Sequence, residues 1–353
     1  MAKLPLQPTQ FVGIQTLRFI AALLVVVTHA TLAIVERFNI SSYSIWHNGG
    51  VGVNIFFVIS GFVMVVSSQK LLFLEDGAKL FLQKRLIRIV PIYWVATTLK
   101  LCIVLLIPAV TLHSNFDIWH TLSSYFFIPA KNGEGVITPI HAVGWTLTYE
   151  MFFYCMFALA LYFKKSAVLF VSVFFIALLT VGSLLDLSGW TVLDYYSRPI
   201  IFQFVMGMLI GALYIKKINI HPFIAWLLIF SGFAQVLTET YIVSEPVFEG
   251  FLRWGLPSAM IVAGVVFVEA SLKNYIPKTL TELGNGSYSL YLFHPFIIPA
   301  IGIMLAKAGV NNPTIAMTIM VVVPILVCQV IYFYIEAPIT SSLTKYTVNQ
   351  SRK

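Results

Sequence analysis

Long apolar runs alternate with short polar connections along the whole chain. Runs of roughly 17–25 apolar residues are long enough to form helices that cross a bilayer. Ten such runs can be marked out, at residues 12–35, 51–68, 91–110, 145–163, 166–185, 199–215, 221–241, 251–270, 286–306 and 314–336. The pattern predicts an all-α, polytopic membrane protein that forms a single domain over residues 1–353.

Two of the polar connections are longer than the others. Residues 69–90 mix apolar and basic positions at helical spacing, which is typical of a helix lying on the cytoplasmic membrane surface. Residues 111–144 form the longest loop, which we expect on the opposite side. The first apolar run is too long for a signal-peptide core and no small-residue cleavage site follows it, so we expect it to be retained as the first helix.

The composition agrees with a membrane location. Hydrophobic residues make up 59% of the chain and charged residues only 10%, whereas a soluble domain of this length needs far more charged surface. The net charge of +8 could suggest a nucleic-acid partner. The basic residues instead stand at the ends of apolar runs, which is the pattern of membrane topology, so no nucleic acid is expected.

The distribution of lysine and arginine predicts the orientation. With the N-terminus in the cytoplasm, most basic residues of the connections fall on the cytoplasmic side. Only a few fall on the other side, namely Arg37, Lys131, Arg198, Arg253 and Lys307. An even number of spans returns the C-terminus to the cytoplasm. The three cysteines show no pairing pattern and the seven histidines show no ligand spacing, so neither a disulfide framework nor a metal site is expected.

The first apolar run carries two polar residues on one face. Arg18 and His29 are separated by about three helical turns, which places them within about 20° of each other and roughly 16 Å apart along the axis. A charge at bilayer depth costs about 2.5–3.5 kcal/mol or more unless it has partners or water. Each residue alone could be a structural partner; together they favour a functional polar path.

Two further segments contain polar residues: one combines them with small residues, and the other carries an arginine pair. The stretch GGVGVNIFFVISGF at 49–62 contains Asn54 and Ser60, and tight helix packing through its glycines is the stronger interpretation. Arg85 and Arg88 lie one turn apart before Pro91, where we expect the third span to begin. Two guanidinium groups on one face suit phosphate binding, although positive-inside anchoring explains them as well.

A carboxylate enters the fourth apolar run in the stretch HAVGWTLTYEMFF. Glu150 lies about five residues into this run from the outer side, at a depth comparable with that of His29. Because lipid-facing carboxylates are rare, we expect its side chain in the interior. A carboxylate that orients a histidine is the usual arrangement for a general base. The alternative is a structural pair between Glu150 and a histidine or an arginine.

The stretch GNGSYSLYLFHPF at 284–296 places three ring side chains on one helix face. Tyr288, Tyr291 and His294 are spaced by three residues. Tyr291 and His294 are candidate substrate-binding residues, although a hydrogen-bonded packing role for His294 is at least as good an interpretation as a catalytic role. Farther along, Glu336 ends the last apolar run and is expected to form an ion pair at the inner face.

Taken together, these motifs resemble acyltransferase family 3, which comprises integral-membrane O-acyltransferases. The resemblance covers nearly the whole chain and depends on the order of the motifs. They are Arg18 with His29, the GVxxFFxxSGF-like stretch, Arg85-x-x-Arg88 before Pro91, Trp145-Thr-Leu-Thr-Tyr149-Glu150, Tyr288-x-x-Tyr291-x-x-His294, and Glu336-Ala-Pro338.

The resemblance implies an acyl-CoA donor, typically acetyl-CoA, used as a co-substrate and not as a bound cofactor. It implies an acceptor hydroxyl on a glycan or lipid-linked saccharide, and a location in the bacterial inner membrane. By position, Arg18, His29 and Glu150 match essential residues, and Arg85 with Arg88 matches a proposed donor-binding pair. Some relatives carry a further SGNH esterase-like domain, which is not expected here because the chain stops soon after the tenth run.

The sequence therefore favours O-acetylation of a cell-envelope or exported polysaccharide. His29 would act as the base and Glu150 would polarise it, while Ser60, Asn54 or Tyr149 could donate to the oxyanion. Transfer of another acyl group such as succinyl, a transporter of a glycan or small molecule, and a non-catalytic scaffold remain alternatives. No internal repeat supports the transporter. The sequence predicts no oligomeric state.

Overall fold

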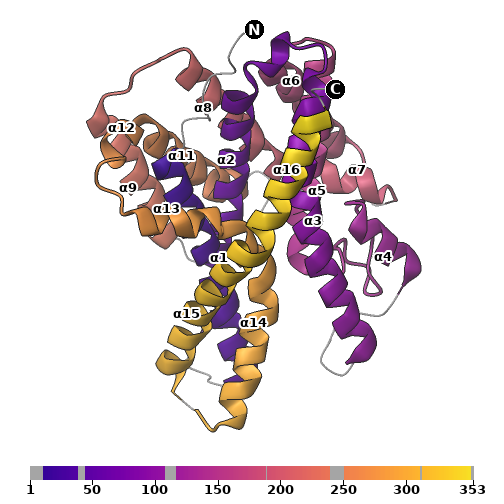
Figure 1. Cartoon of the computed structure of the whole chain (residues 1–353), viewed down its shortest axis with the longest axis vertical. Coiled ribbons are helices and arrows are strands. Elements are labelled where there is room, and N and C mark those ends of the chain that lie inside the picture. The colour runs from indigo at the N-terminus through magenta and orange to yellow at the C-terminus, as the bar shows by residue number, and fades with distance from the viewer. Residues whose placement is uncertain are drawn as a thin grey trace. The chain divides into compact units, whose positions relative to one another are not determined.

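The computed structural model describes residues 11–38, 44–107, 117–187, 189–238, 250–310 and 312–350. Helices dominate these residues (Figure 1), and their β structure is an isolated bridge between Lys131 and Ile137. The all-α prediction is confirmed for this part of the chain. The ends of two predicted runs, 108–110 and 239–241, and the loop residues 111–116 lie outside the described residues.

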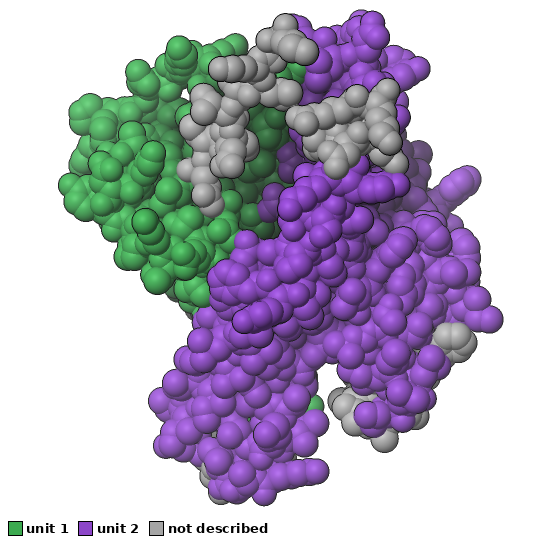
Figure 2. All heavy atoms as spheres, in the orientation of Figure 1, with its two compact units in different colours: residues 1–70, 202–288 green, residues 71–201, 289–353 purple. Residues whose placement is uncertain are grey.

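The chain divides into two compact units, and each unit consists of two separate chain segments. Unit 1 comprises residues 1–70 and 202–288, and unit 2 comprises residues 71–201 and 289–353 (Figure 2). The division groups the polar motifs: Arg18 and His29 belong to unit 1, whereas Arg85, Arg88 and Glu150 belong to unit 2.

Unit 1 is held together by closely packed apolar helices. Its elements are α1 (Val12–Phe38), η1 (His47–Gly50), α2 (Val51–Ser68), α8 (Phe202–Ile215), α9 (Pro222–Thr238), η6 (Phe251–Gly255), α11 (Leu256–Phe267), α12 (Glu269–Leu272) and α13 (Lys278–Asn285). Helix α2 packs against α1, α8 and α11, and α9 packs against α11. The core between them is mainly aliphatic, with Leu17, Ile55 and Val262 among its buried members.

Glycines let the helices of unit 1 approach to backbone contact. A Cβ atom added at Gly61 of α2 would lie 2.1 Å from the Phe204 carbonyl oxygen of α8, and one added at Gly207 of α8 would lie 2.0 Å from the Val58 carbonyl oxygen of α2. A Cβ atom at Gly52 would lie 2.1 Å from the Ala21 carbonyl oxygen of α1. Small residues are the usual means by which membrane helices pack this closely. The packing interpretation of the 49–62 stretch is therefore confirmed.

Unit 2 has a more aromatic interior. Its elements are η2 (Leu71–Phe73), α3 (Gly77–Leu106), α4 (Ile118–Tyr125), η4 (Ala142–Gly144), α5 (Trp145–Tyr162), α6 (Ala167–Leu184), α7 (Thr191–Tyr196), η5 (Pro199–Ile201), α14 (Ser287–Lys307, from its third residue on), α15 (Pro313–Ile331), η7 (Tyr332–Glu336) and α16 (Ala337–Gln350). Helix α3 packs against α5 and α16, and α5 packs against α6. Phe81, Tyr93, Tyr149, Phe153 and Phe157 are among its fully buried side chains.

Helix α3 corrects the predicted boundary between residues 90 and 91. The sequence favours a surface helix over 69–90 and a separate span that begins at Pro91, but α3 is continuous from Gly77 to Leu106 with Pro91 inside it. A proline is well suited to a helix start, yet membrane helices also tolerate it in their interior because neighbouring groups satisfy the freed backbone. The arginine pair consequently lies well within a long helix.

Six of the described helices are long and apolar enough to cross a membrane. They are Val12–Phe38, His47–Ser68, Gly77–Leu106, Ala167–Leu184, Ser287–Lys307 and Pro313–Thr347. Three predicted runs form shorter apolar helices, at Pro199–Ile215, Pro222–Thr238 and Phe251–Phe267. The predicted run at 145–163 forms α5 (Trp145–Tyr162), whose first turns are polar. The chain is a multi-pass membrane protein, while the count of about ten spans and the cytoplasmic placement of both termini stay predictions.

Candidate functional site

In unit 1, helix α1 carries the predicted base. His29 Nδ1 lies 2.9 Å from the Val25 carbonyl oxygen one turn earlier. Because a carbonyl oxygen only accepts, this bond places the proton of the neutral ring on Nδ1 and the basic lone pair on Nε2. Arg18 is half-buried on the same helix, and its Nη1 atom donates to Gln15 Oε1 over 3.4 Å. The backbone of α1 thus fixes the tautomer that a general base requires.

Asn54 and Ser60, the polar residues of α2, differ in their surroundings. Ser60 is buried, and Asn54 is half-buried. Gln203 Nε2 of α8 donates to Asn54 Oδ1 over 2.8 Å, which leaves the amide nitrogen of Asn54 as its donor group. Sequence reasoning missed Gln203, although a glutamine within the apolar run 199–215 is a signal that could have found it.

In unit 2, α3 and α5 bring four polar side chains together. Arg85 and Arg88 lie on the face of α3 that also carries Phe81, and Phe81 packs against Tyr154 of α5 with ring centroids 6.1 Å apart. The Tyr154 hydroxyl donates a short hydrogen bond to Glu150. Arg88, Tyr154 and Glu150 all lie within electrostatic range of Arg85. The arginine pair is therefore beside Glu150, whereas the sequence suggested opposite ends of the two spans.

Tyr154 is a second residue that sequence reasoning missed. It follows Glu150 by four residues, so the two side chains share one face of α5. That spacing could have identified it. A buried phenol that donates to a carboxylate stabilises the charge of the carboxylate and fixes its position.

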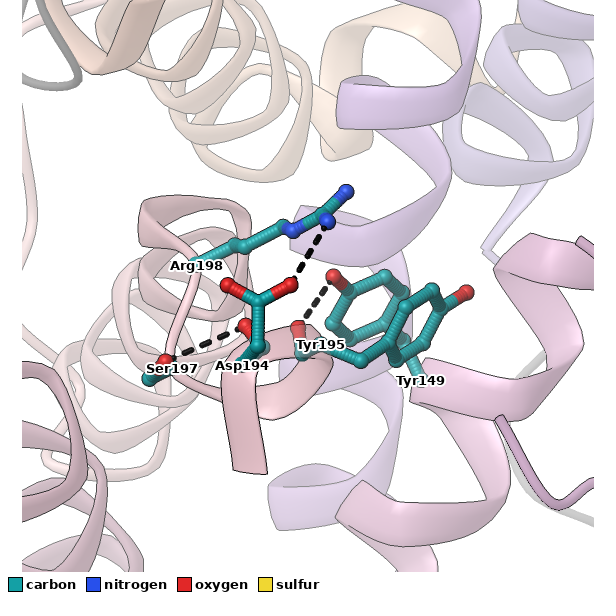
Figure 3. Close-up of polar contacts among 5 residues, drawn as sticks. All are labelled: Tyr149, Asp194, Tyr195, Ser197 and Arg198. Atoms are coloured by element: carbon teal, nitrogen blue, oxygen red, sulfur yellow. Dashed lines mark hydrogen bonds and ion pairs between the residues drawn. The ribbon is translucent and has the colours of Figure 1, made fainter. Parts of the chain in front are cut away.

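Two tyrosines connect the start of α5 to α7. The Tyr149 hydroxyl donates to the Tyr195 carbonyl oxygen over 2.6 Å, and the Tyr195 hydroxyl donates to the Trp145 carbonyl oxygen over 2.7 Å. The two rings stack with centroids 4.4 Å apart (Figure 3). Burial raises the pKa of Tyr195, so its hydroxyl stays protonated as a donor. No local sequence signal indicated Tyr195.

Helix α14 places Tyr291 and His294 in the interior of unit 2. The Tyr291 hydroxyl donates to the Val143 carbonyl oxygen over 3.1 Å and accepts from the Thr146 hydroxyl over 3.0 Å. His294 is fully buried, and its Nδ1 atom donates to the Leu290 carbonyl oxygen over 2.9 Å. This environment suits the packing interpretation of His294. Tyr288, the first member of the three-residue pattern, falls in unit 1.

A buried histidine attaches the connection before α5 to α14. His141 Nε2 donates to the Leu292 carbonyl oxygen over 2.9 Å, and its ring stacks on Phe296. Burial lowers the pKa of His141 to about 4, and the bond to Leu292 opposes this shift only in part. His141 is therefore neutral near pH 7 and has a structural role.

Glu336 accepts hydrogen bonds in this structure, and its expected ion pair at the inner face stays a prediction. Its carboxylate accepts from the Ser289 backbone nitrogen over 3.1 Å and from the Ser289 hydroxyl over 2.6 Å. Ser289 lies in the first turn of α14, where backbone N–H groups lack partners within the helix. The carboxylate thus caps α14 and interacts favourably with the positive end of its dipole.

The fold and the polar residues together define the class of protein. The protein is a multi-pass helical membrane protein in which an oriented histidine, an arginine pair and a bonded carboxylate lie on otherwise apolar helices. The family model for the acyltransferase domain of acyltransferase family 3 matches residues 11–333. The chain belongs to this acyltransferase family, as its motifs predicted.

Two relatives extend the comparison. The chain is 35% identical over 277 residues to the exopolysaccharide production protein ExoZ of Rhizobium meliloti, an alignment that covers 74% of this chain and 79% of the relative. It is 25% identical over 332 residues to the O-acetyltransferase OatA of Staphylococcus aureus, which covers 83% of this chain and 53% of the relative. The chain thus matches about half the length of OatA. No solved structure matches it significantly.

Proposed function

We propose that this protein transfers an acetyl group from cytoplasmic acetyl-CoA to a hydroxyl group of a cell-envelope or exported polysaccharide, in the bacterial inner membrane. The family match over residues 11–333 supports acyl transfer. The names of the two relatives, one a polysaccharide production protein and the other an O-acetyltransferase, support a polysaccharide hydroxyl as the acceptor. The acetyl group and its CoA carrier follow from the family resemblance of the motifs.

The oriented ring of His29 is the observation that carries the proposed chemistry. With Nδ1–H donated to the Val25 carbonyl, Nε2 can take the proton of the acceptor hydroxyl. The hydroxyl oxygen then attacks the thioester carbonyl, and the resulting tetrahedral intermediate breaks its C–S bond. The proton held by His29 passes to the departing sulfur, so that an ester and free CoA are formed. We propose that the charge of Glu150 favours the protonated form of the His29 ring as it takes this proton, while the hydrogen bond to Val25 fixes the ring.

The remaining candidates receive roles according to their bonding. Arg85 and Arg88 bind the phosphates of CoA, and Arg18 continues the polar path. Among the three candidates for the oxyanion donor we favour Asn54, because its oxygen is occupied by Gln203 and its nitrogen is left to donate. The Tyr149 proton is donated to Tyr195, and Ser60 is buried. Tyr291 and His294 shape the interior of unit 2 next to the start of α5.

A deletion strain tests the function and separates it from the transporter alternative. If the protein is an acyltransferase, mass spectrometry of the surface polysaccharide should show the same repeating unit without one acyl group. If it is a transporter, the amount of exported polysaccharide should fall while any acyl groups remain. The mass lost per repeating unit also identifies the acyl group, because loss of acetyl removes about 42 Da and loss of succinyl removes about 100 Da. Complementation with the wild-type chain should restore the acyl group.

A further inference from the structure

A groove with a volume of about 570 Å³ opens in unit 2, apart from the charged cluster of α3 and α5. This volume lies within the roughly 300–1,000 Å³ that ligand pockets of proteins span. One wall is the connection that precedes α5, and the other runs from the end of α6 into α7. Its polar and apolar lining includes Lys131, Val136, Asp186, Thr191, Asp194 and Arg198.

The wall before α5 is a fixed turn. Asn132 Oδ1 accepts from the backbone nitrogens of Glu134 and Val136, over 3.0 and 2.9 Å. Gly135 adopts a φ of 82°, which a residue with a side chain rarely adopts, and the bridge between Lys131 and Ile137 closes the turn. The hydrogen bonds hold the backbone of this wall in one conformation.

The α7 wall holds its charged groups in place. Arg198 Nη2 lies 3.1 Å from Asp194 Oδ2, and the Arg198 guanidinium lies over the Tyr195 ring at 5.6 Å. The Ser197 hydroxyl donates to the Asp194 carbonyl oxygen over 3.1 Å (Figure 3). The ion pair is half-exposed, so its outer oxygen and nitrogen atoms can reach a ligand.

The charges of the groove balance, which indicates the class of ligand. Lys131 and Arg198 supply two positive charges, and Asp186 and Asp194 supply two negative charges. A polyphosphate such as the CoA moiety would meet both carboxylates and gain no net attraction. A neutral molecule rich in hydroxyls can donate to the carboxylates and accept from the cations. Val136 and nearby leucines offer apolar contact for the C–H face of a sugar ring.

The groove is attached to the helix that carries Glu150. The Tyr195 hydroxyl bonds to the Trp145 carbonyl at the first turn of α5, and Tyr149 returns a bond to the Tyr195 carbonyl. Glu150 is the next residue along α5. A ligand in the groove is therefore held at the end of α5 where its proposed functional residues begin.

We propose that this groove binds neutral sugar residues of the polysaccharide acceptor and so selects the acceptor and not the acyl donor. This inference rests on the proposed function. It assigns acceptor binding to a surface formed by the connection before α5, the end of α6, and α7.

The test uses full-length protein in lipid nanodiscs, radiolabelled acetyl-CoA, and the host's own polysaccharide after mild alkali has removed its O-acyl groups. The double variant Lys131→Ala/Asp186→Asn removes one charge of each sign, and Thr191→Trp fills the groove. Each should raise the acceptor KM at least about tenfold and leave the KM for acetyl-CoA within about twofold. The matched control is Lys165→Ala/Glu75→Gln, which makes the same charge change at exposed positions outside the groove and should leave both KM values unaltered.

Direct binding of the same polysaccharide to immobilised nanodiscs separates the two proposals. If the wild type transfers acetyl groups and the groove variants keep the acceptor KM, the groove proposal is wrong and the function stands. If the wild type transfers no acetyl group but binds polysaccharide in a way that the groove variants lose, the groove proposal stands and the acetyl-CoA reaction is wrong. If the wild type neither transfers nor binds, both are overturned.

Discussion

The two units use different means to pack helices in a membrane protein. In unit 1, glycines bring backbones into contact between α2 and α8, and the core around them is aliphatic. In unit 2, buried aromatic side chains fill the interior, and the hydroxyls of Tyr93, Tyr149 and Tyr291 donate to backbone carbonyl oxygens. Helix packing in unit 1 therefore depends on glycines that leave room for backbone contact, and helix packing in unit 2 depends on polar side chains whose hydrogen bonds are satisfied.

The difference indicates how each unit can carry function. Close backbone packing in unit 1 gives a rigid helix pair, beside which α1 presents one oriented histidine. The hydroxyl network in unit 2 tolerates charged groups, because a buried carboxylate or guanidinium persists only with hydrogen-bond partners.

Replacement of the oriented histidine in unit 1 should have the largest effect. His29→Ala removes the Nε2 base. General-base assistance typically raises a rate about 10²–10⁴-fold, so the rate of acyl transfer should fall by a factor near the upper end of that range. Radiolabel incorporation into polysaccharide measures it, with membrane insertion checked by gel filtration. His221→Ala, at an exposed position, is the control. Near-normal acetylation by His29→Ala would rule out His29 as the general base.

In unit 2, Glu150→Gln should cause the next largest loss. The amide keeps the shape of the side chain but cannot polarise an imidazole, so the rate should fall about 10²-fold or more with little change in KM for acetyl-CoA. Tyr154→Phe removes the hydroxyl that donates to Glu150 and should cost less, because the charge remains. Peptide mapping after labelling without acceptor gives a further check: label on Glu150 would show a covalent intermediate and overturn direct transfer.

A larger side chain at a packed glycine should destabilise unit 1. Gly61→Ala places a methyl group against the Phe204 carbonyl and should lower the free energy of unfolding by about 1–3 kcal/mol, as measured by SDS titration. Gly50→Ala is the matched control, because nothing lies within 4 Å of the added carbon atom. Equal stability of the two variants would contradict backbone contact as the basis of unit 1 packing.

The arginine pair of unit 2 should affect the donor more than the acceptor. Arg85→Ala/Arg88→Ala removes two guanidinium groups and should raise the KM for acetyl-CoA about tenfold, equivalent to about 1.4 kcal/mol. The acceptor KM should change little. Lys164→Ala/Lys165→Ala removes the same charge from an exposed turn and serves as the control. Unchanged donor affinity in the arginine variant would reduce the pair to a topological or structural role.

The smallest effect should be a pH dependence of unit 2 that comes from His141. Its pKa is about 4 in the folded protein and near the ordinary 6.5 in the unfolded chain, so the unfolded state binds the proton first as the pH falls. Stability is then fully present above pH 6.5 and is lost toward pH 4, by about 1 kcal/mol between pH 6.5 and 5.5. His141→Gln keeps a donor for the Leu292 carbonyl and should remove this part of the pH dependence.

The helices were predictable because the length and apolarity of a run decide whether it forms one. The glycine packing of 49–62 was also predictable, since small residues have few other uses in a membrane helix. The position of Arg85 and Arg88 within a long helix could not be predicted, because Pro91 is compatible with both the start and the interior of a membrane helix. Tyr195 and the groove depend on contacts between connections far apart in sequence, and no periodicity reports such contacts.

We propose that the protein joins an acyl group from CoA to a polysaccharide hydroxyl in one direct step. The most direct measurement is the stoichiometry of the reaction in nanodiscs, with free CoA and new O-acetyl esters counted in the same sample. We expect one CoA released per ester formed, CoA release only when deacylated polysaccharide is present, and loss of both products in His29→Ala. CoA release without acceptor, or movement of intact polysaccharide with no CoA released, would contradict it.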